Sequence, residues 1–229
     1  MEHALFPIAV FCAIVSLAGA IVWLRSHFEK KRTEALRAVA DDIGLQFLAT
    51  EDEELLVKMN AFPLFNKGRR RKIKNVMTTE TDIARLTIFD YQYTTGGGNN
   101  SHTHHHTVLS MESDALSLPH FALHPEGFLQ RVGAAIGMQD IDFEDHPEFS
   151  NSFMLKGENE QSVRNFFDAE VLKFLAERKG ICVESAPGAF IYFRGARRKP
   201  EQVHEFMNEA FTIYSAFAER LSRPPSSSN

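Results

Sequence analysis

The chain has 229 residues and a net charge of −5, with 25 lysines and arginines against 30 acidic residues. This mild excess of acid argues against nucleic acid as a partner, because proteins that bind nucleic acid need clustered positive charge. The two cysteines, Cys12 and Cys182, stand in unrelated apolar stretches and are not expected to pair. A disulfide scaffold is therefore excluded, and the cysteine usage fits a reducing compartment.

The N-terminus carries the longest apolar run of the chain. Leu5 to Leu24 is twenty consecutive residues without a charge. As a helix this run is about 30 Å long, which matches the hydrocarbon thickness of a bilayer. A cleaved signal peptide is the alternative, because Ala18-Gly19-Ala20 imitates a cleavage site, but the residues before the run are not basic. We therefore expect an uncleaved transmembrane anchor over residues 1–24, with the lipid bilayer as partner through residues 5–24.

Basic residues flank this run on one side only. Arg25, Lys30, Lys31 and Arg32 follow it, and no lysine or arginine precedes it. Because lysine and arginine favour the cytoplasmic side of a span, a single-pass topology with residues 25–229 in the cytoplasm is predicted. A periplasmic location is the alternative if the charge rule misleads.

Residues 25–49 are predicted to continue the anchor as a juxtamembrane helix, since Leu36, Val39, Ala40 and Ile43 recur at helical spacing. Residues 50–150 read as an antiparallel β-rich subdomain with a flexible glycine-rich loop, because glycine and asparagine tolerate positive φ. In chain order its predicted elements are strands over 72–79, 82–94 and 104–112, a loop over 96–100 and a short helix over 128–136.

The last third of the chain, residues 151–222, is predicted to be a β-α-β-β-α subdomain, followed by a disordered tail over 223–229. Its predicted elements are a strand over 153–155, an amphipathic helix over 161–179, a hairpin of strands 181–185 and 189–194, and a last helix from Pro200 to Leu221. Antiparallel strands packed with amphipathic helices are typical of an α+β fold. The predicted class is thus α+β, preceded by a single transmembrane helix.

A run of histidines is the sharpest candidate for chemistry. On a strand, His102, His104 and His106 share one face, and alternate histidines of this kind bind zinc or copper. The run follows a triple-glycine loop, however, where the rigidity that a catalytic metal needs is poor. An exposed hairpin end is therefore the leading interpretation, with metal binding as the alternative.

The segment from Lys67 to Lys74 holds six basic residues among eight. Phosphate groups of lipids are one class of partner, since each cation near an anionic leaflet contributes about 1 kcal/mol. The alternative is a solvated strand start whose charges pair with acidic residues elsewhere, and nucleic acid is the least favoured partner. The candidate lipid-binding residues are Arg69, Arg70, Arg71, Lys72 and Lys74.

Familiar catalytic and nucleotide-binding motifs are missing from the sequence. It contains no P-loop, no Gly-x-Gly-x-x-Gly, no Cys-x-x-Cys, no His-Glu-x-x-His and no Gly-x-Ser-x-Gly. We therefore expect no cofactor, and a non-enzymatic interaction or scaffold module that binds an unidentified protein or lipid headgroups. A metal-dependent enzyme that uses His102 to His106 is the alternative.

Several short motifs carry a family resemblance. They are Phe89-Asp90-Tyr91-Gln92-Tyr93 before the glycine-rich loop, Leu118-Pro119-x-Phe121, Asp140-Ile-Asp142-Phe143, Pro147-Glu148-Phe149-Ser150, and the strand–helix–hairpin–helix end. With these motifs the chain resembles uncharacterised bacterial membrane-anchored proteins that carry a domain of unknown function, over roughly residues 30–221. The resemblance implies this topology and a bacterial inner-membrane setting, and it transfers no catalytic residue.

Overall fold

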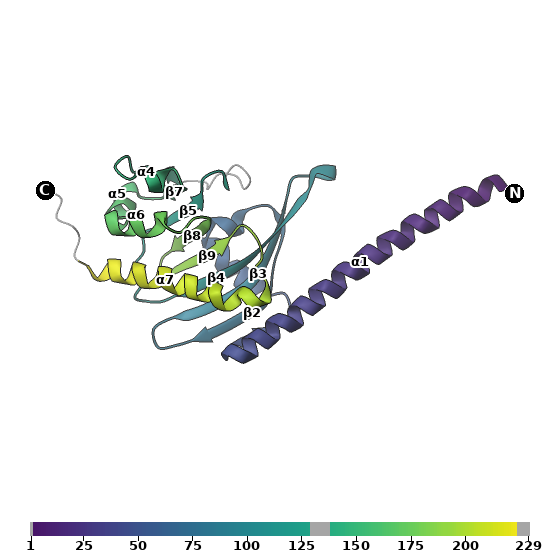
Figure 1. Ribbon diagram of the computed structural model, residues 1–229, viewed down its shortest axis with the longest axis horizontal. Coiled ribbons are helices and arrows are strands. Elements are labelled where there is room, and N and C mark those ends of the chain that lie inside the picture. The colour runs from purple at the N-terminus through teal and green to yellow at the C-terminus, as the bar shows by residue number, and fades with distance from the viewer. Residues whose placement is uncertain (1, 129–137, 224–229) are drawn as a thin grey trace.

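The computed structural model describes residues 2–128 and 138–223, with side chains from Val15 on, that of Asn99 excepted. Its centre is one antiparallel sheet whose strands are ordered β1-β2-β3-β4-β9-β8-β5-β7-β6 (Figure 1). The strands are β1 (Gln46–Leu48), β2 (Arg69–Glu80), β3 (Arg85–Thr95), β4 (His102–Glu112), β5 (Phe121–Pro125), β6 (Gln139–Asp140), β7 (Phe153–Gly157), β8 (Ile181–Ala186) and β9 (Ala189–Arg194).

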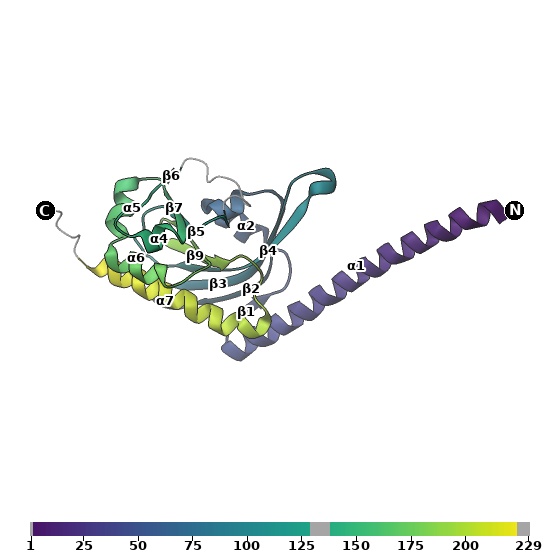
Figure 2. The same ribbon diagram turned by 45° about the horizontal axis from the view of Figure 1, so that its top comes forward.

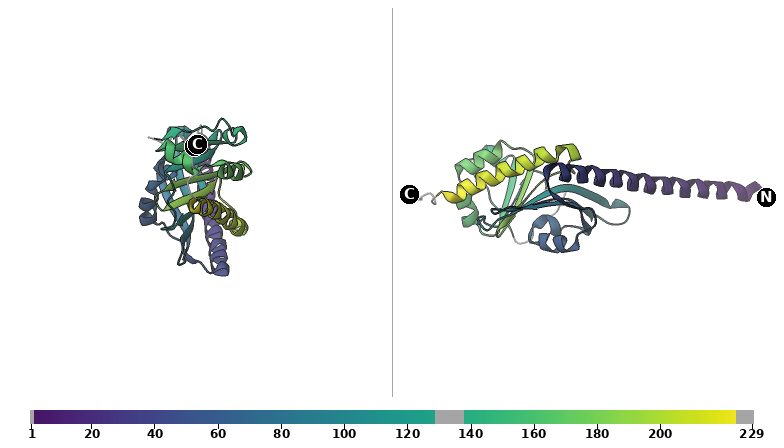
Figure 3. Two further views of the ribbon diagram at one scale, coloured as in Figure 1. Left: turned by 90° about the vertical axis from the view of Figure 1, so that its left-hand side faces the viewer. Right: turned by 90° about the horizontal axis from the view of Figure 1, so that it is seen from below.

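Helices cover both faces of this sheet. They are α1 (Glu2–Ile43), α2 (Glu53–Lys58), α4 (Pro147–Ser150), α5 (Glu160–Phe166), α6 (Ala169–Ala176) and α7 (Val203–Ser222), with 3-10 turns η1 (Met59–Ala61), η2 (Pro63–Asn66), η3 (Gly98–Asn100) and η4 (Pro200–Gln202). Helices α5, α6 and α7 lie on one side of the sheet, and α2 with the turns that follow it lies on the other (Figure 3). We call these sides the α7 face and the α2 face.

Strand alternation gives each face its own apolar core. On β3, Leu86 and Ile88 belong to the core of the α7 face, whereas Phe89, Tyr91 and Tyr93 belong to that of the α2 face. This follows from the pleat, which directs neighbouring side chains to opposite sides of a sheet. The sheet is therefore buried on both sides, which explains why its central strands have few exposed residues.

Helix α1 is docked at its C-terminal end only. Leu36 and Ala40 are buried against the sheet, while the apolar side chains from Val15 to Phe28 are exposed. The helix projects well beyond the sheet toward the N-terminus (Figures 1 and 2). The exposed large apolar residues of this projecting part are Val15, Leu17, Ile21, Val22, Trp23, Leu24 and Phe28.

A buried carboxylate holds the docked end of α1 in place. Arg32 donates two hydrogen bonds of 2.7 Å to Asp90 on β3, one to each carboxylate oxygen. Asn75 and Thr107 donate to the same carboxylate over 3.0 and 3.2 Å, and Arg197 lies 3.5 Å from it. Asp90 thus joins the first helix to three elements of the sheet region.

A β-bulge aims one of these donors at Asp90. The β2–β3 register shifts between Lys74 and Met77, and Asn75 has a φ of +53° within that interval. Bulges of this kind re-aim a side chain, and the left-handed region is one that asparagine tolerates well. Asn75 also accepts a hydrogen bond of 2.9 Å from Thr33 of α1, so the bulge contributes to the docking of that helix.

The predicted transmembrane anchor over residues 1–24 is wrong. Within residues 2–128 and 138–223, no helix has the length and apolar character that a membrane span requires. The run belongs to a longer helix that continues past Arg25 without a break. The bilayer contact through residues 5–24 and the single-pass inner-membrane location, which depended on that anchor, are wrong for the same reason. The predicted cytoplasmic placement loses the argument on which it rested.

The α+β class with an antiparallel sheet is confirmed, with differences of detail. The predicted helix over 161–179 is two helices, α5 and α6, because the chain turns at Phe167 and Asp168 accepts a hydrogen bond from Val171 N to begin the second helix. Strands from both sides of the predicted boundary at residue 150 share one sheet. The expected helix over 128–136 and the tail over 223–229 fall almost wholly outside the described residues.

Replacing Asp90 by Asn should destabilise the protein by about 3 kcal/mol, because Arg32 would keep a buried charge without a counter-charge. Urea unfolding measures the change. Asp82→Asn is the matched control, since Asp82 is exposed and takes part in no ion pair among the described residues. Equal unfolding midpoints for the two variants would contradict the role given to Asp90.

Candidate functional site

Three arginines gather where β2 begins, beside the loop that joins β3 to β4. The register pairs Arg69 with Thr94, and the pairing shifts between Arg69 and Lys72, where Arg70 has a φ of +53°. We call Arg69, Arg70 and Arg71, together with the loop over 96–101, the basic tip. The β3–β4 hairpin that forms it projects from the same end of the molecule as α1 (Figures 1 and 2).

The basic residues between Arg69 and Lys74 differ in the partners that they contact. Lys72 and Lys74 form ion pairs with Glu51, at 2.7 and 3.3 Å, and the hydrogen bond from Lys72 lowers the pKa of that carboxyl. Arg69 and Arg71 instead donate to the backbone carbonyls of Gly96 and Phe65.

The arginines of the basic tip keep their charge without a counter-ion. In the described part of the chain, no carboxylate forms an ion pair with Arg69, Arg70 or Arg71. The residues of the loop over 96–101 include no acid. An unneutralised cationic surface with exposed backbone is a natural place for an anionic partner.

The histidine run lies on β4 next to this tip. Its register with β3 places His102, His104 and His106 on the α2 face, with His102 exposed at the loop end and His106 buried. The Nε2 of His104 lies 2.7 Å from the hydroxyl of Thr95, and both His104 and His106 stack on Tyr93. No three histidine, cysteine or acidic side chains among the described residues are grouped to hold a metal ion.

His106 is a neutral imidazole with a defined tautomer. Its Nδ1 lies 3.0 Å from the carbonyl oxygen of Arg194, so Nδ1 carries the proton and donates. Burial lowers the pKa of His106 to about 4, against the effect of that hydrogen bond. Its Nε2 therefore presents a buried lone pair at neutral pH.

Beneath the basic tip, the α2 face buries a set of polar side chains that we call the inner cluster. Its members are Lys67, Tyr91, Tyr93, His106, His124 and Glu184, all with less than a tenth of their surface exposed. Glu184 accepts hydrogen bonds of 2.8 Å from Leu64 N and from His124 Nε2. Of these residues, local sequence patterns pointed to Lys67, in the basic segment, and to His106, in the histidine run, as candidate site residues. His124 and Glu184 lie 60 residues apart, so no local motif joins them. The sequence signal that could have indicated the cluster is Glu184, an acid within the strand Ile181–Ala186, which is buried on both sides.

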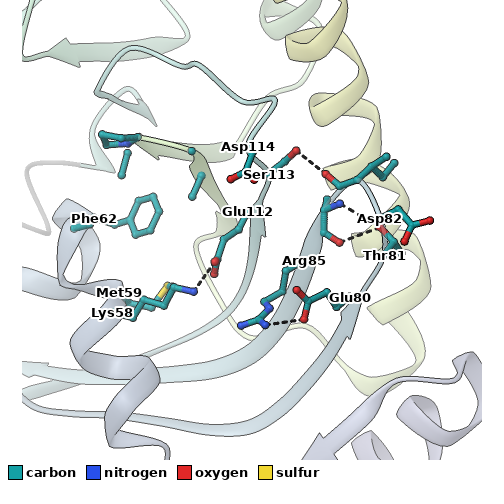
Figure 4. A pocket seen from close by; sticks show the side chains of 17 residues that line it. Lys58, Met59, Phe62, Glu80, Thr81, Asp82, Arg85, Glu112, Ser113 and Asp114 are labelled. Atoms are coloured by element: carbon teal, nitrogen blue, oxygen red, sulfur yellow. Dashed lines mark hydrogen bonds and ion pairs between the residues drawn. The ribbon is translucent and has the colours of Figure 1, made fainter.

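A groove of about 560 Å³ opens at the other end of the α2 face (Figure 4). Lys58 pairs with Glu112 and Arg85 with Glu80 among the residues that line it, and Phe62 also lines it. Its cations are thus neutralised by neighbouring acids, in contrast to those of the basic tip.

The chain was compared with known proteins. No protein-family model and no curated protein matches it, so the resemblance drawn from the sequence motifs stays a prediction. A solved structure that shares the fold is the mycobacterial trehalose monomycolate transport factor A, TtfA. The match has a TM-score of 0.61 and covers 86% of this chain and 98% of TtfA at 13% sequence identity. At that identity the likeness shows the fold alone.

The buried imidazole of His106 should make stability depend on pH. Its folded pKa of about 4 lies below the unfolded value near 6.5, so the unfolded state binds the proton more tightly. Stability is then complete above pH 6.5 and falls as the pH drops toward 4, by about 3 kcal/mol. His106→Asn, which keeps a donor for the Arg194 carbonyl, should flatten this dependence in urea unfolding. His102→Gln, at an exposed site, should leave it unchanged, and a parallel pH profile for the His106 variant and the wild type would contradict the assignment.

Proposed function

We propose that this chain is a non-catalytic interaction module that binds anionic lipid headgroups through the basic tip. The observation that carries the proposal is the absence of a carboxylate partner for Arg69, Arg70 and Arg71 among the described residues, while Lys72 and Lys74 next to them are paired with Glu51. Arginine forks suit phosphate oxygens because two N–H groups contact two oxygens at once.

The shape of this end of the protein supports the same proposal. The β3–β4 hairpin projects from the body of the sheet on the side from which α1 also projects (Figure 1). The positive φ of Arg70 turns the strand at the bulge, and its side chain is exposed. The exposed apolar side chains of α1 lie toward the same end.

The fold comparison gives independent, coarser support. TtfA, which shares the fold, is named as a transport factor for trehalose monomycolate. A lipid-related role for the present chain is consistent with that name. The headgroup contact itself is argued from the residues of the basic tip.

The proposal predicts that Arg69→Gln combined with Arg70→Gln weakens binding of the full chain to anionic vesicles by about 30-fold. This loss follows from about 1 kcal/mol for each cation near an anionic surface. Flotation with vesicles of phosphatidylcholine, with and without a third of phosphatidylglycerol, measures it.

The matched control removes two exposed charges elsewhere, by Lys173→Gln and Lys179→Gln at the end of α6. This control should float like the wild type, and Arg69→Lys with Arg70→Lys should retain most of the binding. Equal flotation of the wild type with neutral and anionic vesicles would remove the proposal.

A further inference from the structure

The groove at the far end of the α2 face carries more acid than its own cations neutralise. Four carboxylates line it, and two of these form the ion pairs with Lys58 and Arg85 described above (Figure 4). The other two, Asp82 and Asp114, are exposed and form no ion pair among the described residues. The groove therefore keeps a negative charge that suits a cationic partner.

A second hollow continues the groove along the same face. It has a volume of about 280 Å³, and Lys58, Arg85 and Glu112 line it as well as the first. It adds two further carboxylates, Asp52 and Glu54, and no further cation. We call the two hollows together the acidic groove, which extends from the β2–β3 turn to the start of α2.

The walls of the acidic groove are fixed to one another within the fold. Ser113 N donates to the carbonyl oxygen of Gly188 over 2.9 Å, and Ser113 Oγ donates to that of Ile83 over 2.6 Å. One residue after β4 thereby joins the β2–β3 turn to the β8–β9 turn. A groove that is already ordered loses less conformational entropy when it binds a partner.

The same chain carries a cationic projection that matches this groove. Arg69 and Arg70 of the basic tip are exposed and stand beside a loop of small glycine, asparagine and serine residues. In the groove, the apolar side chain of Ile83 is 69% exposed. Arginine suits such a surface, because its hydrocarbon stem covers apolar groups while its guanidinium binds carboxylates.

The basic tip of a chain is too far from the groove of that chain to fill it. Strand β3 connects the two sites, with Arg85 at the groove and Thr95 at the loop. Its eleven residues extend over about 35 Å. A contact between tip and groove therefore needs two copies of the chain.

We propose that the acidic groove of one copy binds the basic tip of a second copy, with Asp82 and Asp114 as partners of Arg69 and Arg70. The two surfaces differ, so each contact leaves a free tip on one copy and a free groove on the other, and association continues head to tail. This contact does not rest on headgroup binding, but it uses the same arginines, so an anionic lipid surface competes with it.

Sedimentation velocity of the full chain tests the proposal at about 50 mM and about 500 mM salt. At low salt the sedimentation coefficient should rise with protein concentration, and at high salt it should return to that of the monomer, because salt screens exposed ion pairs. Association through the exposed apolar side chains of α1 would persist at high salt, and that outcome would overturn the proposal. So would a purely monomeric chain at low salt and about 0.1 mM protein.

Two double variants then test the two surfaces. Arg69→Gln with Arg70→Gln is the tip variant, and Asp82→Asn with Asp114→Asn is the groove variant. Each should weaken self-association at low salt by at least about tenfold, the loss expected for two exposed ion pairs. Undiminished self-association of either variant would refute the proposal.

The matched control removes two exposed acids from α7, by Glu205→Gln and Glu219→Gln. Neither residue forms an ion pair among the described residues, and this control should associate like the wild type. It separates the effect of the groove carboxylates from a general change in net charge.

A mixture of the two variants is the decisive experiment. The tip variant keeps an intact groove and the groove variant keeps an intact tip, so the mixture should form a one-to-one complex that grows no further. Such a complex also shows that both variants are folded, and its absence would contradict the pairing of tip with groove. Flotation with anionic vesicles should be weakened in the tip variant only, so failure of this proposal is distinguishable from failure of the headgroup proposal.

Discussion

The buried carboxylate of Asp90 decides where the first helix meets the sheet. Two arginines, Arg32 from α1 and Arg197 from the segment before α7, approach it from different parts of the chain. If either element moved away, the buried carboxylate would lose a counter-charge, at a cost of about 3 kcal/mol, which is a large fraction of the stability of a domain. The same carboxylate accepts hydrogen bonds from β2 and β4. One side chain therefore fixes the position of α1 relative to the sheet.

The two faces of the sheet are built by different physical means. On the α7 face, Phe217 packs edge to face on Phe121 and Phe166, at 6.1 and 5.2 Å between ring centroids, and helices α5, α6 and α7 cover this core. On the α2 face, a polar cluster is enclosed by one short helix and 3-10 turns. The α7 face is thus an apolar core, while the α2 face and the basic tip next to it carry polar and charged groups.

Local patterns in the sequence were enough to predict the central strands and the last helix, because alternation and helical spacing depend on neighbouring residues only. Features that depend on distant partners were not accessible. Glu51, which neutralises Lys72 and Lys74, lies more than twenty residues earlier in the chain, and the partner of His124 lies on another strand. The length of an apolar run alone misled the assignment of residues 1–24. The run lies within one helix that extends to Ile43, and no helix among the described residues has the length and apolar character of a membrane span.

The continuity of α1 has a mechanical consequence. No loop interrupts the helix between its projecting part and the residues that Asp90 holds, so the two form one rigid arm. From Glu2 to Glu29 this arm reaches about 42 Å. A partner that binds the N-terminal part of α1 therefore sets both its own distance from the sheet and the angle between them. A rotation of that part of the helix is transmitted to the strands beside Asp90.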